Sequence, residues 1–180
     1  PSDELPPTLA RPRVRRYIRR QFAWVARWYG VQRVVEKTCA NSLRVGFVNR
    51  VVPEARFLFI RRDGIDAAAS AMERWHAHPD PVYLARKARF VPLTDWPHYA
   101  WKIARGRVRG LLGGARNPKP WGPRLDGMDA LLAQRPLEEV CALQWKRCVD
   151  SAADAFAKMP ADRWLEVVYE DFVRAPEEEL

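Results

Sequence analysis

One stretch of the chain, FLFIRRDGIDAAASAMERW at residues 57–75, constrains the fold more than any other. The segment ARFLFI at residues 55–60 is apolar almost without alternation, which is typical of a strand covered on both faces in a parallel sheet. A charged turn that contains a glycine follows it, and residues 66–75 have the pattern of a helix. The sequence therefore predicts a strand, a tight turn and a helix, which is the repeating unit of an α/β domain.

The patterns on either side continue this alternation. Apolar residues at helical spacing, with arginines between them, predict a helix from Pro12 that stops at Gly30 and has a basic outer face. Further helices are predicted at 41–52, before Pro53, and at 136–159, before Pro160, and further strands at 31–38 and 163–172. This order favours an α/β domain with right-handed crossovers.

The region at residues 76–124 differs from the rest of the chain. It is rich in proline and carries basic helical pieces, but it has no strand pattern that would support a core of its own. We interpret it as a helical lid inserted into a single domain that covers residues 1–180.

The charge balance favours an anionic partner. The chain of 180 residues has 31 Lys plus Arg against 22 Asp plus Glu, a formal net charge of +9. Nucleic acid, a membrane surface, an acidic polymer and a phosphorylated cofactor all fit this balance, so charge alone does not choose among them.

The cysteines indicate a reducing compartment. Cys39, Cys141 and Cys148 are odd in number and fit no metal-ligand spacing, so we expect free thiols, no bound metal and a location in the cytoplasm. Cys141 and Cys148 are seven residues apart on a predicted helix, where we expect them to pack as small apolar side chains on one face. No apolar run has the length needed to cross a bilayer.

Three predicted strands end on polar residues, at 36–38, 61–63 and 169–171. Ligands of open parallel sheets bind outside these carboxyl ends. Arg62 offers a planar set of donors there, and the predicted helix begins just after it with free backbone N–H groups, so the turn has the outline of a phosphate site. Ser70 can bring a hydroxyl to the same oxygens.

Neighbouring residues have structural interpretations. Asp63 can cap the helix that follows, and Asp66 can help to hold the turn. Arg61 points away from Arg62 if the strand persists, so we expect it to meet solvent or an Asp side chain.

The strand, turn and helix at residues 56–75 resemble a segment of a known family. RFLFIRRDGIDAAASAMERW resembles the 3'-phosphate-binding segment of the PAPS-dependent sulfotransferases, in which an apolar strand is followed by Arg, turn residues, Asp, and Ser eight positions after the Arg. VVEKT resembles the Glu-Lys-Thr strand end of carbohydrate-type and bacterial members, and LEVVYEDFVRAPEEEL resembles their Tyr-Glu-Asp strand. The likeness covers residues 31–180.

The resemblance implies a fold, a cofactor and site residues. The fold would be a three-layer parallel sheet of the P-loop NTPase-like sulfotransferase type, and the cofactor would be PAPS (3'-phosphoadenosine 5'-phosphosulfate). Arg62 and Ser70 would hold the 3'-phosphate of PAPS, and Tyr169 would lie near the adenine. Lys37 would take the catalytic place beside the sulfuryl group or the acceptor.

Two parts of the family pattern are missing. The sequence has no strand with a Gly-containing loop that would wrap the 5'-phosphosulfate, since its only Gly-rich piece, RGLLGGARNPK, lacks the Lys-Ser/Thr ending. The C-terminal Arg-Lys-Gly segment of many members is absent as well. We therefore expect the chain to be a truncated domain.

Each site residue also has a structural interpretation. Lys37 could form a salt bridge with Glu36 or a neighbouring acid, and Tyr169 could pack at the sheet edge. Further candidates for catalysis or stacking lie in or near the lid, where a structural role is the simpler interpretation: His76, His78, His98, Trp75, Trp96, Trp101 and Trp121.

The functional hypothesis is transfer of a sulfuryl group from PAPS to a hydroxyl or amine of a carbohydrate, a lipid or a small molecule. The basic lid at residues 76–124 would form the cleft for this acceptor, and its charge suits an anionic one. The main alternative is a basic α/β module that binds a nucleotide or nucleic acid without turnover. A small-molecule kinase is a third hypothesis, but the phosphate-loop motif it needs is missing.

Overall fold

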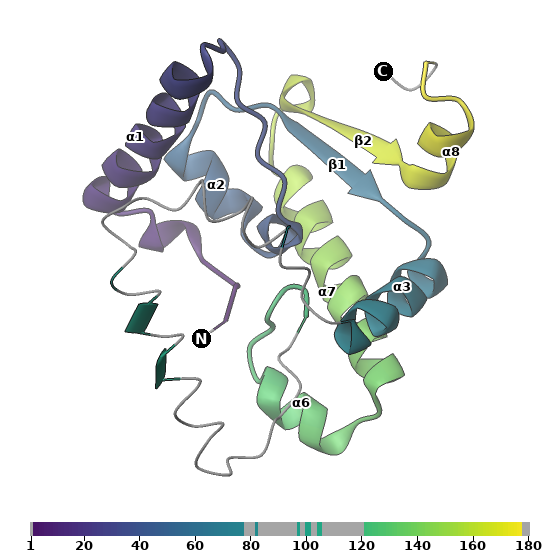
Figure 1. Cartoon of the computed structure of the whole chain (residues 1–180). Helices are drawn as coiled ribbons and strands as arrows, with labels where there is room; N and C mark the ends of the chain where they lie inside the picture. The colour runs from purple at the N-terminus through teal and green to yellow at the C-terminus, as the bar shows by residue number, and fades with distance from the viewer. Residues whose placement is uncertain are drawn as a thin grey trace.

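The structure is a computed structural model that describes residues 2–77 and 121–177, with residues 82, 97, 100, 101, 104 and 105 between them. Most of the predicted lid therefore lies outside the described residues. The elements are η1 (Pro7–Leu9), α1 (Pro12–Tyr29), η2 (Cys39–Leu43), α2 (Val45–Val51), β1 (Phe57–Arg61), α3 (Gly64–His76), α6 (Met128–Gln134), α7 (Leu137–Phe156), η4 (Ala161–Arg163), β2 (Trp164–Val168) and α8 (Tyr169–Arg174) (Figure 1).

Strands β1 and β2 form a parallel pair, as the alternation of elements predicted (Figure 1). Phe57 pairs with Trp164 at one end, and Arg61 pairs with Val168 at the other. The described residues contain a sheet of these two strands, so the third strand that was predicted at residues 31–38 is wrong. That segment is irregular, and Val35 in it is 91% exposed. Residues with a high β propensity form a strand only beside a neighbouring strand, and no described strand lies beside this segment.

Only one face of β1 is packed. Phe59 is buried, whereas Leu58 and Ile60 on the other face are 59% and 53% exposed. The prediction of a strand covered on both faces is therefore wrong for the described structure. The apolar residues on both sides gave no sign of which face a helix would cover.

Helix α7 covers the packed face of the sheet and forms the centre of the molecule (Figure 1). Near its end the Phe156 ring stacks on Trp164, with ring centres 4.9 Å apart, and lies 5.4 Å from the Phe59 ring. This aromatic contact fixes the sheet on the helix.

A second cluster joins α7 to α3 and α6. Trp75 of α3, Met128 of α6 and Val140 of α7 are buried together, and Cys141 belongs to the same cluster. Cys148 packs against this cluster from the same helix, so the predicted packing of both thiols on one face is confirmed. All three cysteines are free.

Helix α1 confirms its predicted limits. It ends at Gly30, whose φ of 63° places it in the left-handed region that favours glycine. Within α1 no residue is fully buried, and Ile18 packs against Phe47 and Val51 of α2. In the part of the chain that the structure describes, no helix has the length and apolar character to cross a membrane.

Candidate functional site

The candidate site lies at the turn between β1 and α3, where the sequence pattern placed it. Asp63 caps α3 as predicted, because its Oδ1 accepts hydrogen bonds from the backbone N–H of Ile65 at 2.8 Å and of Asp66 at 3.1 Å. These two N–H groups are therefore already satisfied. The sequence predicted that the helix N-terminus would help to bind an anion at this turn. The structure leaves that role mainly to side chains.

The end of β2 is tied to the same turn. A side-chain oxygen of Glu170, in the first turn of α8, accepts a hydrogen bond from the backbone N–H of Asp63 at 3.0 Å. This contact gives Glu170 a structural role at the turn. It joins the residues that follow the two strands.

Arg62 and Tyr169 lie against each other. They are the residues that follow the last pair of the strand register, Arg61 with Val168. The guanidinium carbon of Arg62 lies 5.1 Å from the centre of the Tyr169 ring, which is a cation–π distance. Parallel pairing thus brings two of the predicted site residues together.

Trp145 of α7 supports the turn from the other side. Its indole Nε1–H donates a hydrogen bond to the backbone oxygen of Arg62 at 3.1 Å. The ring also covers Gly64 so closely that a Cβ there would lie 2.9 Å from ring carbons. The backbone that carries Arg62 is therefore held by the cap, by Glu170 and by Trp145.

The Arg62 guanidinium is only partly satisfied. Its nearest carboxylate is that of Asp66, and Nη2 lies 3.9 Å from Oδ2, which is a long ion pair. The Nε atom of Arg62 is buried and has no hydrogen-bond partner in the described part of the chain. A guanidinium donor without an acceptor is costly, and 38% of the Arg62 side chain is exposed, so this group is suited to a phosphate or sulfate oxygen.

Ser70 lies in α3, where it is partly buried. Ser70 is four residues after Asp66, so the two side chains share one face of the helix. Asp66 forms its ion pair with Arg62 from this face. The described residues show no hydrogen bond between Ser70 and Arg62. The structure places them on the same side of the turn without joining them.

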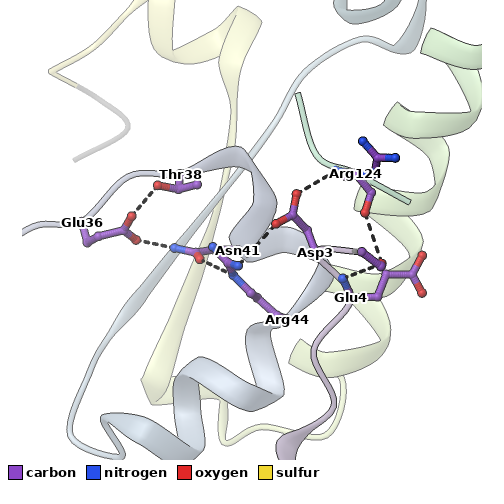
Figure 2. Close-up of polar contacts among 8 residues, drawn as sticks. Asp3, Glu4, Glu36, Thr38, Asn41, Arg44 and Arg124 are labelled. Carbon is purple, nitrogen blue, oxygen red and sulfur yellow. Dashed lines mark hydrogen bonds and ion pairs between the residues drawn. The ribbon is translucent and has the colours of Figure 1, made fainter. Parts of the chain in front are cut away.

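Lys37 lies in the irregular segment between α1 and η2 and is exposed. It forms no ion pair with a described residue, and the two oxygens of Glu36 are taken by Thr38 and Asn41 (Figure 2). The Glu36 salt bridge considered for Lys37 is therefore not formed. Among the described contacts, no hydrogen bond or ion pair links Lys37 to Arg62 or Tyr169.

A polar network continues from Glu36 into the body of the protein (Figure 2). Arg44 Nε donates to Asn41 Oδ1 at 3.0 Å, and Arg44 Nη1 lies 3.6 Å from Asp3 Oδ1. Asp3 Oδ2 accepts from the backbone N–H of Arg124 at 2.8 Å. The segment that carries Lys37 is thus tied, through the side chains of Glu36, Asn41, Arg44 and Asp3, to the first described residues and to Arg124 at the end of the predicted lid.

Of the other histidines, His76 takes no part in this site. His76 is exposed at the end of α3, with its Nδ1 2.8 Å from the Met72 oxygen, and His78 and His98 lie outside the described residues. The Nε of Arg61 donates to the carboxylate of Glu166 at 2.5 Å, so its partner is a glutamate of β2 and not the solvent or aspartate that was expected. No group of His, Cys, Asp or Glu side chains that could hold a metal occurs among the described residues.

Sequence reasoning missed Trp145, which supports the turn, and Asn41, which supports the segment that carries Lys37. Trp145 and Asn41 each sit in a predicted helix or next to one, where nothing in the pattern names their partners. One signal was available for Trp145. A glycine at the start of a helix that follows an apolar strand indicates a close approach, although not the residue that makes it.

Comparison with known proteins gives one match. A family model described as "Sulfotransferase family" matches residues 3–108, which is more than half of the chain. The matched residues include Lys37, Arg62 and Ser70, whereas Tyr169 lies beyond them. No curated protein and no solved structure matches the chain.

Proposed function

The chain belongs to the sulfotransferase family, and from this premise we propose that it transfers a sulfuryl group from PAPS to a hydroxyl or amine of an acceptor. The single observation that carries the proposal is the Arg62 guanidinium. Arg62 follows strand β1, and hydrogen bonds with Trp145 and Glu170 hold the backbone of the turn. The buried Nε of Arg62 has no partner in the described residues. The 3'-phosphate of PAPS has the charge and the oxygens that this group can bind.

Ser70 and Tyr169 would complete the nucleotide site. Ser70 lies on the helix face that runs from Asp66, so its hydroxyl can add a donor to the phosphate oxygens that Arg62 binds. The Tyr169 ring is 40% exposed and lies beside Arg62, which leaves ring surface for stacking with the adenine. These roles rest on the family resemblance together with the positions of the residues.

When bound, PAPS supplies a sulfuryl group that is activated for transfer. In the transfer the sulfur–oxygen bond to the phosphate breaks, a bond from sulfur to the acceptor oxygen or nitrogen forms, and the acceptor loses a proton. The protein's contribution would be positioning and charge neutralisation. Arg62 would fix the nucleotide end, and the exposed Lys37 ammonium would neutralise charge on the oxygen that leaves with the phosphate.

The acceptor would be a carbohydrate, a lipid or a small molecule, bound by the basic and Trp-bearing segment at residues 76–124. An anionic acceptor suits that charge. The alternative, a basic module that holds nucleic acid without turnover, would use the arginines of the chain but would need neither Ser70 nor Tyr169.

The test is calorimetric titration with adenosine 3',5'-bisphosphate. Arg62→Ala should weaken binding at least tenfold, since a charge-assisted contact to phosphate is lost. Ser70→Ala should weaken it severalfold. The matched control is Arg61→Ala, which removes the same charge from the adjacent position but only breaks the pair with Glu166; it should change affinity by less than about twofold, the effect of a surface ion pair.

A second ligand separates the 3'-phosphate from the rest of the nucleotide. Adenosine 5'-monophosphate lacks that phosphate, so Arg62→Ala should leave its weaker binding unchanged. Wild-type affinity in Arg62→Ala, or tight and salt-dependent binding of RNA without nucleotide preference, would contradict the proposal.

A further inference from the structure

Helix α1 carries arginines and tryptophans in two adjacent stripes. Arg13, Arg20 and Arg27 are seven residues apart, so they lie nearly on one line along the helix. Trp24 and Trp28 are four residues apart and form a second line beside the first. Their rings stack with centres 5.7 Å apart.

Both stripes are turned outward. The Trp24 side chain is 43% exposed and that of Trp28 is 70% exposed, which is unusual for the largest apolar side chain. The arginines of the first stripe are exposed as well, and none of them forms an ion pair within the described part of the chain. The helix contains six arginines and no acidic residue.

The opposite side of α1 holds the helix on the protein. Ile18 packs on the α2 residues Phe47 and Val51, and Arg19 binds Glu54 with a shortest distance of 2.6 Å. Helix α1 thus lies at the edge of the molecule, with α2 on its inner side (Figure 1). The contacts of Ile18 and Arg19 fix the inner face of α1, so the aromatic stripe on the other face is exposed to solvent.

We propose that this stripe pair, Trp24 and Trp28 with Arg13, Arg20 and Arg27, binds the surface of an anionic lipid bilayer. Trp side chains have an apolar body and a polar N–H that suit the headgroup level of a membrane. Arginines in a line beside them reach lipid phosphates, and each adds to the attraction of an anionic surface. The helix lies in the interface plane, because its arginines prevent it from spanning the bilayer.

Charge complementarity and the tryptophans together favour lipid over nucleic acid. Arginines alone would serve either partner. The tryptophans stack on each other along the helix, and an apolar stripe of this kind matches the boundary between headgroups and acyl chains better than a phosphate backbone.

The surface is separate from the proposed nucleotide site. In Figure 1 α1 lies across the molecule from the end of β1, where Arg62 follows the strand. Membrane binding and nucleotide binding can therefore be tested independently, and either can fail without the other. A sulfotransferase held at a bilayer by α1 would work on acceptors at that surface.

The experiment is sedimentation of the full chain with vesicles at about 0.15 M salt, where charge is partly screened. Vesicles of phosphatidylcholine with phosphatidylglycerol should bind the protein, and vesicles of phosphatidylcholine alone should bind it at least tenfold more weakly. The triple variant R13E/R20E/R27E should lose at least tenfold in affinity for the anionic vesicles. The variant W24S/W28S should also lose binding, and the fluorescence of the bound wild type should shift to the blue.

The matched control is R50E/R56E/K158E, which changes the net charge equally at exposed positions outside α1. It should bind like the wild type. Circular dichroism checks that each variant is folded, and titration with adenosine 3',5'-bisphosphate should give the same affinity for all of them.

Several outcomes would overturn the proposal. Equal loss in the control variant would mean that bulk charge and not α1 sets the binding. Equal binding to neutral and anionic vesicles, unchanged binding by W24S/W28S, or capture of single-stranded RNA in place of vesicles through the same arginines would each contradict a lipid surface as the partner.

Discussion

Arg62 packs its guanidinium over the ring of Tyr169, 5.1 Å from the ring centre, although more than a hundred residues separate them in the sequence. The parallel register of β1 and β2 produces this contact, because each residue follows the last pair of its strand. The ring thus holds the side chain on which nucleotide binding is proposed to depend.

The contact predicts a difference between two substitutions of Tyr169. Tyr169→Leu removes the ring face that contacts Arg62 and would stack on the adenine. It should weaken binding of adenosine 3',5'-bisphosphate at least about two- to fivefold, since the exposed cation–π contact alone contributes about 0.5–1 kcal/mol. Tyr169→Phe keeps the ring and should bind like the wild type. Equal affinity of both variants in calorimetric titration would show that the ring does not position Arg62.

The close approach of Trp145 to Gly64 predicts a stability effect at the turn. Gly64→Ala places a Cβ 2.9 Å from the indole ring, which cannot easily move because its N–H is bonded to the Arg62 oxygen. Overpacking of this kind costs about 1–3 kcal/mol, which exceeds the gain of about 1 kcal/mol from alanine in a helix. Urea unfolding should show the difference.

The partner variant Trp145→Ala supplies the control. In its background the added methyl group of Gly64→Ala has room, so the destabilisation by alanine should vanish or reverse. A double-mutant cycle with no coupling between the two positions would contradict the packing argument.

The sequence predicted local features of this region well. The apolar run before Arg62, the cap at Asp63 and the stop at Gly30 each depend on residues a few positions apart, and the structure confirms them. The pairing of β1 with β2 was predicted as parallel because helices separate the strands in the sequence.

Features that depend on distant partners were less accessible. Val-rich residues 31–38 suggested a strand, but a strand needs a neighbour, and the structure gives this segment side-chain contacts from Asn41 and Thr38 to Glu36 instead. Trp145 could not be assigned from the pattern, because its hydrogen bond to Arg62 joins residues that are close only in the fold. The exposure of Leu58 and Ile60 likewise depends on which face α7 covers.

The network around Glu36 predicts that Asn41 orders the segment that carries Lys37. Asn41→Ala removes a donor to Glu36 and an acceptor of Arg44, each contributing about 0.5–1.5 kcal/mol. The backbone N–H of Arg44 donates to the backbone oxygen of Asn41 at 3.0 Å, and without the side-chain contacts its hydrogen exchange should accelerate about tenfold.

Asn49→Ala is the matched control for this prediction. Asn49 accepts a hydrogen bond from Arg163 at 3.2 Å, so its loss affects the link between α2 and η4 instead. Exchange at Arg44 should be unchanged in that variant. Acceleration by both variants alike would mean that general destabilisation, and not the network, controls the segment.

The three cysteines predict a selective reaction with iodoacetamide. Cys39 is exposed, whereas Cys141 is buried and Cys148 packs against the same cluster. Burial raises the pKa of Cys141, and it raises the pKa of Cys148 to about 12 with a smaller contribution from nearby negative charge. Since only the thiolate reacts, mass spectrometry at pH 8 should find modification of Cys39 alone in the folded protein and of all three in urea.

The raised pKa of Cys148 also sets the direction of a pH effect on stability. The folded state keeps a proton on this thiol that the unfolded state releases above its ordinary pKa of 9.0. The free energy of unfolding should therefore fall as the pH rises from about 9 towards 12, and it should be insensitive to this group below that range. Cys148→Ala removes the group, so its free energy of unfolding should decline less between pH 8 and pH 10 than that of the wild type. Parallel declines for the two proteins in urea titrations would show that the thiol is not held neutral by the fold.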